Sequence, residues 1–385
     1  MHPEMEMLKC SIVRGGTSKG IFIMKNELPK DPVKRDQVIC AIYGSPDLRQ
    51  IDGLGGADVL TSKLAIISPP SRPDADVDYT FGQVSFEAKF VDYGGNCGNL
   101  SAAVGPYAID EGLVEPVEPI TTVRINLTNS NNILVAKVPV RNGKACVEGD
   151  YTIDGVPGTG AKITLDWSDT AGAITGKLLP TGNVKDIISV HGKAYEVSLV
   201  DAGNPLVFIH ADSLGMRGTE SPNEIEANKE LMTTIEEIRG RAAVILGLVK
   251  TPQEAAVKSP YNPFFAIVSP PAEYTAINGE QVNAKEVDIV SRLLFMLRMH
   301  KTYPVTGTVC TGAAVRIPGS IAWEIMRAEA RNKKSINIGH PGGVIPVIAE
   351  AEAIEGQVKL KRIETYRTAR KIMDGYVYVR KAVFK

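Results

Sequence analysis

The alternation of apolar and polar residues along the chain predicts many short strands. Alternating or wholly apolar runs rich in Val and Ile recur between Gly, Asn and Asp residues, which is typical of half-buried and buried strands. The strands that we expect on this pattern cover residues 9–14, 21–24, 64–68, 77–84, 85–93, 122–127, 134–140, 194–200, 206–209, 344–350, 358–365 and 375–381.

Apolar residues three and four positions apart predict a smaller number of helices. Asp31 followed by Pro32 is a typical helix start, so we expect a helix from there to about residue 43. Further helices are expected at residues 222–249 and 285–299, and a helix of small residues begins near Cys97 and ends near residue 109. This order is neither regular strand–helix alternation nor strands alone, so it predicts an α+β protein with antiparallel or mixed sheets.

Two similar segments indicate a duplicated architecture. Residues 95–99 (GNCGN) and residues 307–315 (GTVCTGAAV) each lead into a helix of small residues. A chain of 385 residues is longer than one hydrophobic core usually supports. We therefore expect two domains, residues 1–185 and 186–385, whose terminal strands are free to cross over, with a crevice between them that binds a small molecule.

Composition and charge exclude several classes of protein. The chain is 44% hydrophobic and 23% charged with a net charge of −1, and it carries no dense Lys and Arg cluster for nucleic acid. Its most apolar segment, residues 242–249, is too short for a membrane, and the N-terminus does not resemble a signal peptide, so we predict a cytoplasmic location. Five scattered cysteines predict free thiols, and the spacing of cysteines and histidines predicts no metal.

Cys97 is a candidate proton-transfer residue. It lies where a loop enters a helix, so unpaired backbone amides and the helix dipole would favour its thiolate. Gly98 and Asn99 would present amides to an anion. A buried structural thiol is the alternative, and the N-C-G-N context favours the functional interpretation.

Lys63 interrupts an apolar run that is about to become a buried strand. Burial lowers the pKa of a lysine, so Lys63 would exchange protons near pH 7, or stay charged and hold a carboxylate. A lysine that points to solvent at the edge of the strand is an equally good alternative.

The glycine-rich segment at residues 14–20 (RGGTSKG) is a candidate anion cradle. Its successive amides, the hydroxyls of Thr17 and Ser18 and the ammonium of Lys19 would bind the anion. It is no Walker A motif, because the lysine precedes the last glycine and no hydroxyl follows. Residues 53–58 lack the third glycine of a dinucleotide fingerprint. A plain tight turn is the alternative for both segments.

Polar residues in the second half are expected to line the same crevice. They are His300 at the end of one predicted helix, Thr311 and Gly312 at the start of another, and His340 within residues 338–343. A hydrogen-bonded structural histidine is the alternative for His300 and His340.

Five motifs in order resemble the methylaconitate isomerase family, which includes 3-methylitaconate Δ-isomerase and 4-oxalomesaconate tautomerase. They are RGGTSKG (14–20), IDGLGGAD (51–58), TSK (61–63), NCGN (96–99) and AVGPYA (103–108). DAGNP (201–205) and VTGTVC (305–310) extend the resemblance, which reaches at least residue 343.

The resemblance implies the diaminopimelate epimerase-like fold, in which two similar domains each wrap a β-sheet around a central helix and the active site lies between them. It implies that Lys63 and Cys97 are the catalytic acid and base, in an order that stays open. Cys310 takes the place of the second thiol of two-cysteine epimerases, without an assigned role. The substrate-binding residues expected on these grounds are Thr17, Ser18, Lys19, Ser62, Asn96, Gly98, Asn99, Asn204, His300, Thr311 and Gly312.

The resemblance implies a cofactor-free isomerase that shifts an allylic proton in a small unsaturated di- or tricarboxylic acid. Backbone amides at the helix starts near Cys97 and Thr311, together with residues 17–19, would stabilise the dienolate charge. The preferred reaction converts 3-methylitaconate to 2,3-dimethylmaleate, and 2-methylaconitate isomerisation and 4-oxalomesaconate tautomerisation stay open. So do a two-cysteine racemase or epimerase, a non-catalytic protein that binds an organic acid, and self-association of the chain.

Overall fold

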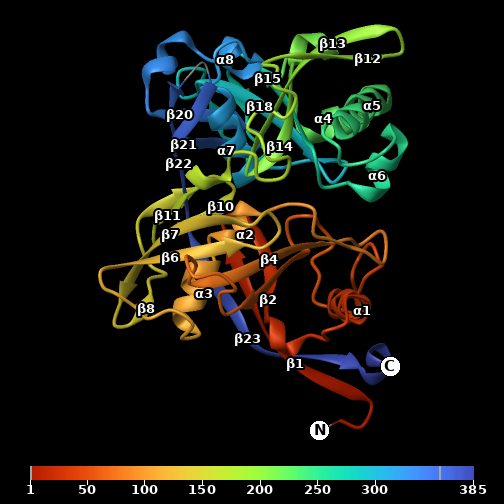
Figure 1. The fold of residues 1–385 in the computed structure, drawn as a ribbon, viewed down its shortest axis with the longest axis vertical. Coiled ribbons are helices and arrows are strands. Elements are labelled where there is room, and N and C mark those ends of the chain that lie inside the picture. The colour runs from red at the N-terminus through yellow and green to blue at the C-terminus, as the bar shows by residue number, and fades with distance from the viewer. Residues whose placement is uncertain (1, 355–356) are drawn as a thin grey trace. The chain divides into compact units, whose positions relative to one another are not determined.

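The computed structural model describes residues 2–354 and 357–385, and its contacts divide the chain into two compact units (Figure 1). The first unit is Met1–Leu165 with Arg367–Lys385, and the second is Asp166–Tyr366. These bounds differ from the predicted division at residue 185. Both ends of the chain belong to the first unit, so its last strand comes from the C-terminus.

The first unit is built mainly of strands. Its helices are α1 (Pro32–Tyr43), α2 (Gly98–Ser101) and α3 (Val104–Asp110). Its strands are β1 (Met5–Gly15), β2 (Ser18–Met24), β3 (Lys63–Ser68), β4 (Val77–Val84), β5 (Val91–Asp92), β6 (Ile120–Leu127), β7 (Asn132–Arg141), β8 (Lys144–Ala145), β9 (Tyr151–Ile153), β10 (Val156–Gly160), β11 (Ile163–Asp166) and β23 (Ala369–Arg380).

The main sheet of the first unit curves around α2 and α3. Its successive pairs are β1–β2 antiparallel, β2–β3 parallel, β3–β4 antiparallel, β4–β6 parallel and β6–β7 antiparallel, and β23 adds to β1. The short helices contact β1 and β2 on one side and β6 and β7 on the other. Their small residues allow this approach, since a Cβ on Gly105 would lie 2.8 Å from a Val138 methyl. The other helix, α1, packs its buried residues on β1–β5 from the opposite face.

The second unit contains longer helices and a similar sheet. Its helices are α4 (Pro222–Ala227), α5 (Lys229–Ile245), α6 (Ala255–Lys258), α7 (Val305–Ala314) and α8 (Ile321–Ile325). Its strands are β12 (Asp186–Val190), β13 (Lys193–Ala202), β14 (Asn204–His210), β15 (Phe264–Ser269), β16 (Tyr274–Thr275), β17 (Gln281–Val282), β18 (Ile289–Phe295), β19 (Arg298–Met299), β20 (Ser335–His340), β21 (Gly343–Ile354) and β22 (Gln357–Arg367).

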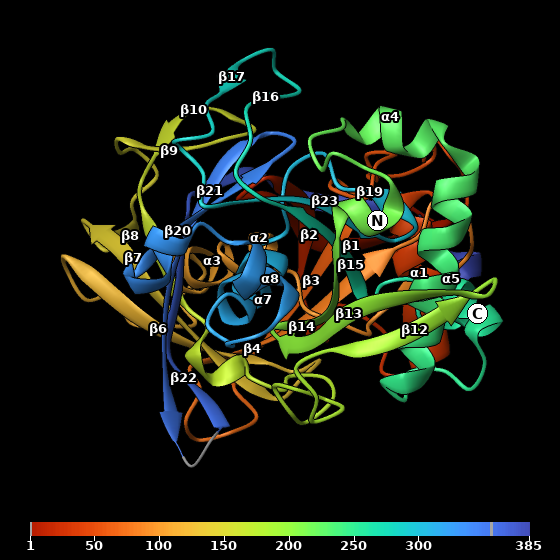
Figure 2. The same cartoon turned by 90° about the horizontal axis from the view of Figure 1, so that it is seen from above.

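The second unit repeats the strand order of the first. The pairs β13–β14, β14–β15, β15–β18, β18–β20 and β20–β21 alternate antiparallel and parallel in the same sequence as β1–β2 to β6–β7. Its central helix is α7, which is buried at almost every residue and contacts β13, β14 and β21 (Figure 2). The duplicated α+β architecture predicted from the sequence is therefore confirmed.

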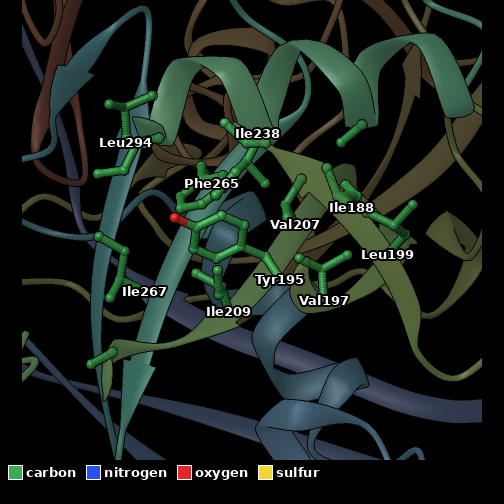
Figure 3. Close-up of a cluster of buried hydrophobic side chains, with 14 of the residues drawn as sticks. Ile188, Tyr195, Val197, Leu199, Val207, Ile209, Ile238, Phe265, Ile267 and Leu294 are labelled. Carbon is green, nitrogen blue, oxygen red and sulfur yellow. The ribbon is translucent and has the colours of Figure 1, made fainter. Parts of the chain in front are cut away.

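A large apolar cluster holds α5 on the sheet of the second unit (Figure 3). Ile235 and Ile238 of α5 are fully buried against residues of β12–β15 and β18, among them Val197, Val207 and Phe265. Burying each such side chain contributes about 1.5–3 kcal/mol. No helix among the described residues is long and apolar enough to cross a membrane.

Most predicted strands are confirmed, but the helix expected at residues 285–299 is wrong. This segment forms β18 and β19, joined by a turn in which Met296 and Leu297 have positive φ. All residues of β18 are buried, because the strand lies between β15 and β20. A strand that is buried on both faces carries apolar residues at odd and even positions alike, which satisfies helical spacing as well as strand spacing, so the pattern alone does not decide between them.

Three smaller expectations are also corrected. Residues 85–93 turn back at Ser85, whose hydroxyl accepts bonds from the amides of residues 87 and 88, so only β5 is a strand. The helix at residues 222–249 is broken at Asn228, whose side chain caps α5. The helix that begins after Cys97 is interrupted between α2 and α3.

Gly20 allows β2 and β3 to approach closely, because it has no side chain. This close approach gives a test of the fold. It pairs with Lys63, and a Cβ on Gly20 would lie 2.4 Å from the Lys63 carbonyl oxygen. We predict that Gly20→Ala lowers the free energy of unfolding by about 1–3 kcal/mol, measured by thermal or urea denaturation.

Gly375→Ala in β23 is the matched control, since the nearest atom to its new Cβ is the flexible Met373 sulfur at 3.4 Å. It should leave stability unchanged or slightly raised. Equal stability of the two variants would contradict the close β2–β3 approach.

Candidate active site

Lys63 is the first residue of β3, and its side chain is buried. It is 2% exposed, so the alternative in which it points to solvent is wrong. Its carbonyl accepts a hydrogen bond from the Tyr43 hydroxyl, which anchors the backbone at this position. Its ammonium donates to Gln83 Oε1 at 2.9 Å and lies 5.3 Å from the centre of the Phe81 ring.

Cys97 meets Lys63 inside the first unit. It immediately precedes α2, and its carbonyl accepts bonds from the Ser101 amide at 2.9 Å and the Ser101 hydroxyl at 2.8 Å. It is 6% exposed, and its thiol interacts with the Lys63 amine and favours the ammonium form. The helix that follows is a single turn, so its dipole is smaller than that of the longer helix expected at residues 97–109.

Burial and nearby charges change the pKa of Lys63 in opposite directions. Burial disfavours the ammonium and is the largest influence, whereas the charges of Cys97 and Asp58 favour it. The result is a Lys63 pKa below its usual value. A buried amine that gives up its proton more readily and interacts with a thiol is suited to taking and returning protons.

Gln83 is a residue of this site that sequence reasoning missed. Its amide nitrogen donates to the carbonyls of Val59 at 3.2 Å and Ser62 at 3.1 Å, and its oxygen accepts from Lys63. The alternation of β4 places Gln83 on one face with Phe81. That alternation was visible in the sequence, but no local feature distinguished Gln83 from a solvent-facing polar residue.

Ser62 is held by the loop that contains the IDGLGGAD motif. Its hydroxyl donates at 2.7 Å to Gln50 Oε1, which also accepts from the Ala57 amide at 2.8 Å. A Cβ on Gly55 would lie 2.1 Å from the Gln50 side chain, so this glycine lets the loop close on Gln50. The motif therefore supports the residue before Lys63, and Gln50 is a second residue that sequence reasoning missed.

The RGGTSKG segment forms the ends of β1 and β2 and the tight turn between them. Three of its amides already donate to protein oxygens: Gly16 to Thr368, Thr17 to Asn99 Oδ1 and Lys19 to Leu60. These three amides are therefore occupied and do not form an anion cradle. Ser18 and Lys19 also project from opposite faces of β2.

The Ser18 hydroxyl differs from its neighbours. Ser18 is 2% exposed, and its oxygen has no hydrogen-bond partner among the described residues. It lies on the face of β2 that carries Gly20, where an added Cβ would meet Leu100 of α2 at 3.0 Å. A buried hydroxyl in this position is available to a ligand oxygen.

The N-C-G-N segment is fixed by side-chain contacts on both sides of Cys97. Asn96 donates to the Ser130 hydroxyl at 3.0 Å, and Gly98 begins α2. Asn99 Oδ1 accepts from Thr17 and from Arg367 Nε at 3.0 Å. Arg367, also missed from the sequence, is buried, and burial lowers its pKa to about 10.

The other predicted residues lie in the second unit and form contacts of their own. Asn204 donates to the Thr306 hydroxyl at 2.7 Å, and Thr311 shares a hydrogen bond of 3.0 Å with the Tyr303 hydroxyl. The Nδ1 atoms of His300 and His340 accept bonds from backbone amides two residues later. A part for these residues in binding the same substrate as Lys63 and Cys97 stays a prediction.

Two details of the second unit correct the sequence analysis. Thr311 and Gly312 lie inside α7, which begins at Val305, and their amides therefore donate to carbonyls one turn earlier. An oxyanion site at a Thr311 helix start is wrong. His300 follows the strand β19 and not a helix.

Cys310 has the properties of a structural thiol. It is fully buried in α7 and donates to the Val200 carbonyl at 3.2 Å. Burial raises its pKa well above the usual value, and the charge of Asp201 adds to this effect. A thiol held in its protonated form is a poor proton acceptor.

The predicted free thiols are confirmed, since none of the five cysteines forms a disulfide. Within residues 2–354 and 357–385, no three His, Cys, Asp or Glu side chains are grouped so that they could hold a metal ion.

Known proteins resemble this chain over nearly its whole length. A family model described as PrpF protein matches residues 5–380. The 3-methylitaconate isomerase of Eubacterium barkeri is 53% identical, with 97% of this chain and 98% of the relative covered. The 2-methyl-aconitate isomerase of Cupriavidus necator is 37% identical, with 98% of both chains covered. The (4E)-oxalomesaconate Delta-isomerase of Novosphingobium sp. (strain KA1) is 38% identical, with 97% of this chain and 98% of the relative covered.

Solved structures agree with these matches. The crystal structure of methylitaconate-delta-isomerase has a TM-score of 0.82 at 52% identity, covering 99% of this chain and 98% of that one. A hydroxyproline epimerase from Agrobacterium vitis shares the fold, with a TM-score of 0.58 at 13% identity, covering 97% and 92% of the two chains. The epimerase-like fold and the family expected from the sequence are thus confirmed, and the chain belongs to the PrpF family.

Proposed function

We propose that this protein is a cofactor-independent isomerase that converts 3-methylitaconate to 2,3-dimethylmaleate by an allylic proton shift. The single observation that carries the proposal is the electrostatic interaction between the buried Lys63 amine and the buried Cys97 thiol. The choice of substrate is supported by the 53% identity to a 3-methylitaconate isomerase, against 36–38% for relatives named for methylaconitate or oxalomesaconate.

The reaction requires one group that removes a proton and one that returns a proton. Carbon 3 of 3-methylitaconate lies between a carboxylate and the C=C unit, so loss of its proton gives a dienolate. A proton then joins the terminal methylene, which becomes a methyl group, and the double bond moves between carbons 2 and 3. Lys63 and Cys97 supply these two groups in the proposal, and their interaction lets a proton pass between them after each turnover.

The dienolate carries extra negative charge on a carboxylate, and the first unit offers polar groups for it. The buried Ser18 hydroxyl is available to a carboxylate oxygen. The Arg367 guanidinium, held beside Asn99, adds positive charge next to the turn that follows β1. Fixed donors and charges of this kind stabilise a developing anion without reorganising.

The rival two-thiol epimerase finds less support. It needs Cys310 as a second base, whereas the Cys310 thiol is buried, bonded to a carbonyl and held protonated. A protein that merely binds an organic acid would have no use for an amine with a lowered pKa beside a thiol.

The proposal includes a cytoplasmic location. A catalytic thiol must stay reduced, and free thiols are typical of proteins in a reducing compartment. Self-association stays a prediction.

The identity of the substrate is tested by a panel of 3-methylitaconate, 2-methylaconitate and 4-oxalomesaconate, with product formation followed by absorbance and proton NMR. We predict the highest kcat/KM for 3-methylitaconate, because the most similar of these relatives is named for it. A higher kcat/KM for either tricarboxylic acid would replace the substrate and leave the proton-shift chemistry in place.

The proton-transfer pair is tested by substitution. We predict that Lys63→Ala and Cys97→Ala each lower kcat by about 10²–10⁴-fold, since each removes a general acid or base. Exchange of deuterium from D₂O into the substrate, measured by NMR, should fall in parallel.

Cys310→Ala is the control for these variants and should retain most of the activity, because its thiol is held away from proton exchange. Loss of activity in Cys310→Ala together with near-normal activity in Lys63→Ala would support the two-thiol mechanism instead.

Ser18 offers a separate test of substrate binding. Removal of a hydroxyl that donates to a carboxylate costs about 1.5–3 kcal/mol, so we predict that Ser18→Ala raises KM by about 10- to 100-fold. Ser11→Ala is the matched control, because this buried serine of β1 donates to Asp374. Equal KM values for the two variants would remove Ser18 from the binding site.

A further inference from the structure

Gln83 is held at both ends of its amide group. Its nitrogen donates to the carbonyls of Val59 and Ser62, so its oxygen faces Lys63 and accepts at 2.9 Å. The opposite orientation of the amide would point oxygen at two carbonyl oxygens and nitrogen at an ammonium. The network therefore determines which end of Gln83 meets the lysine.

The groups that favour the charged form of the Lys63 amine include the thiol of Cys97 on the helix side and the carboxylate of Asp58 in the preceding loop. On β4 the neighbours are Gln83 and the Phe81 ring, both uncharged. Asp92 of β5 lies opposite Gln83 of β4 in the sheet. Its carboxylate accepts a hydrogen bond from the Gly94 amide.

A neutral acceptor at residue 83 has a chemical consequence. A carboxylate in the same position would form a charge-assisted pair with the ammonium and favour its protonated form. An apolar side chain would leave the buried ammonium with less support. An amide oxygen orients the amine and stabilises its charge only modestly.

We propose that Gln83 is a positioning residue for the isomerisation, whose amide oxygen directs the Lys63 amine toward the Cys97 thiol while leaving the lysine able to release its proton. This inference rests on the proposed function, because it assigns Lys63 a proton-transfer role. The isosteric variants Gln83→Glu and Gln83→Met separate the effect of charge from the effect of volume.

The pH dependence of kcat/KM gives the first readout, because it reports essential groups of the free enzyme. In Gln83→Glu, the limb of the pH profile that reports the titration of Lys63 should move to higher pH by about 1–3 units. A shift of this size is expected for an opposite charge within contact distance. The limb should move upward whether Lys63 acts as base or as acid, because a raised pKa shifts either limb in the same direction. In Gln83→Met the limb should move to lower pH.

The titration of Lys63 itself gives a second readout that does not depend on turnover. Carbon-13 NMR of the lysine Cε, assigned by its absence in Lys63→Arg, should show the midpoint moving in the same directions. If the buried glutamate prevents folding, the Lys63 midpoint in Gln83→Met tests the inference by itself. It should lie at lower pH than in the unmodified protein. Because this measurement needs no substrate, its failure is distinguishable from a failure of the proposed activity.

Thr80→Glu is the matched control. Thr80 lies on the same strand but on the opposite face from Gln83, where its hydroxyl bonds to Thr128 at 2.6 Å. A charge there should leave the Lys63 midpoint unchanged, because solvent screens it.

A purely structural role for Gln83 would lower kcat/KM equally at all pH values. Unchanged Lys63 midpoints in both Gln83 variants, or a shift as large in Thr80→Glu as in Gln83→Glu, would overturn the inference. Opposite shifts in the glutamate and methionine variants, without a shift in the control, would support it.

Discussion

A buried amine and a buried thiol interact in the first unit, and the surrounding structure is arranged to keep them together. Burial makes the ammonium form of Lys63 costly, and the thiol of Cys97 partly offsets that cost. Each partner is fixed by its backbone: Lys63 through the Tyr43 hydroxyl and the pairing with Gly20, and Cys97 through the turn closed by Ser101. The proton chemistry proposed here depends on this balance between desolvation and attraction.

The duplicated fold provides this arrangement once. Both units alternate antiparallel and parallel pairs around a central helix, and β3 of the first unit corresponds in this order to β15 of the second. The first residue of β15 is Phe264, fully buried, where β3 begins with Lys63. The thiol of Cys310, in the second central helix, donates to a carbonyl and is kept in its protonated form by burial. One copy of the fold thus carries the proton-transfer pair, and the other has an apolar residue and a structural thiol.

Much of this was predictable from the sequence, and the exceptions have physical reasons. The strands, the duplication and the helix start at Cys97 follow from local patterns, whereas the sequence left the burial of Lys63 as one of two equal alternatives. The buried strand β18 was mistaken for a helix because its apolar residues lie on both faces and therefore show no period of two. Gln83 and Arg367 were missed because their importance comes from partners far along the chain, such as Lys63 and Asn99. The RGGTSKG segment was a candidate anion cradle with a tight turn as the alternative, and in the structure Gly16 and Gly20 allow close packing against Asn99 and Lys63.

The coupling of Lys63 to Cys97 is tested most directly by the Lys63 titration midpoint in the unmodified protein and in Cys97→Ala, followed by carbon-13 NMR of the lysine Cε. Since Cys97 favours the ammonium, the account predicts that its removal lowers the midpoint further. A midpoint that does not change, or that rises, would contradict the interaction between Lys63 and Cys97 and with it the proposed proton-transfer pair.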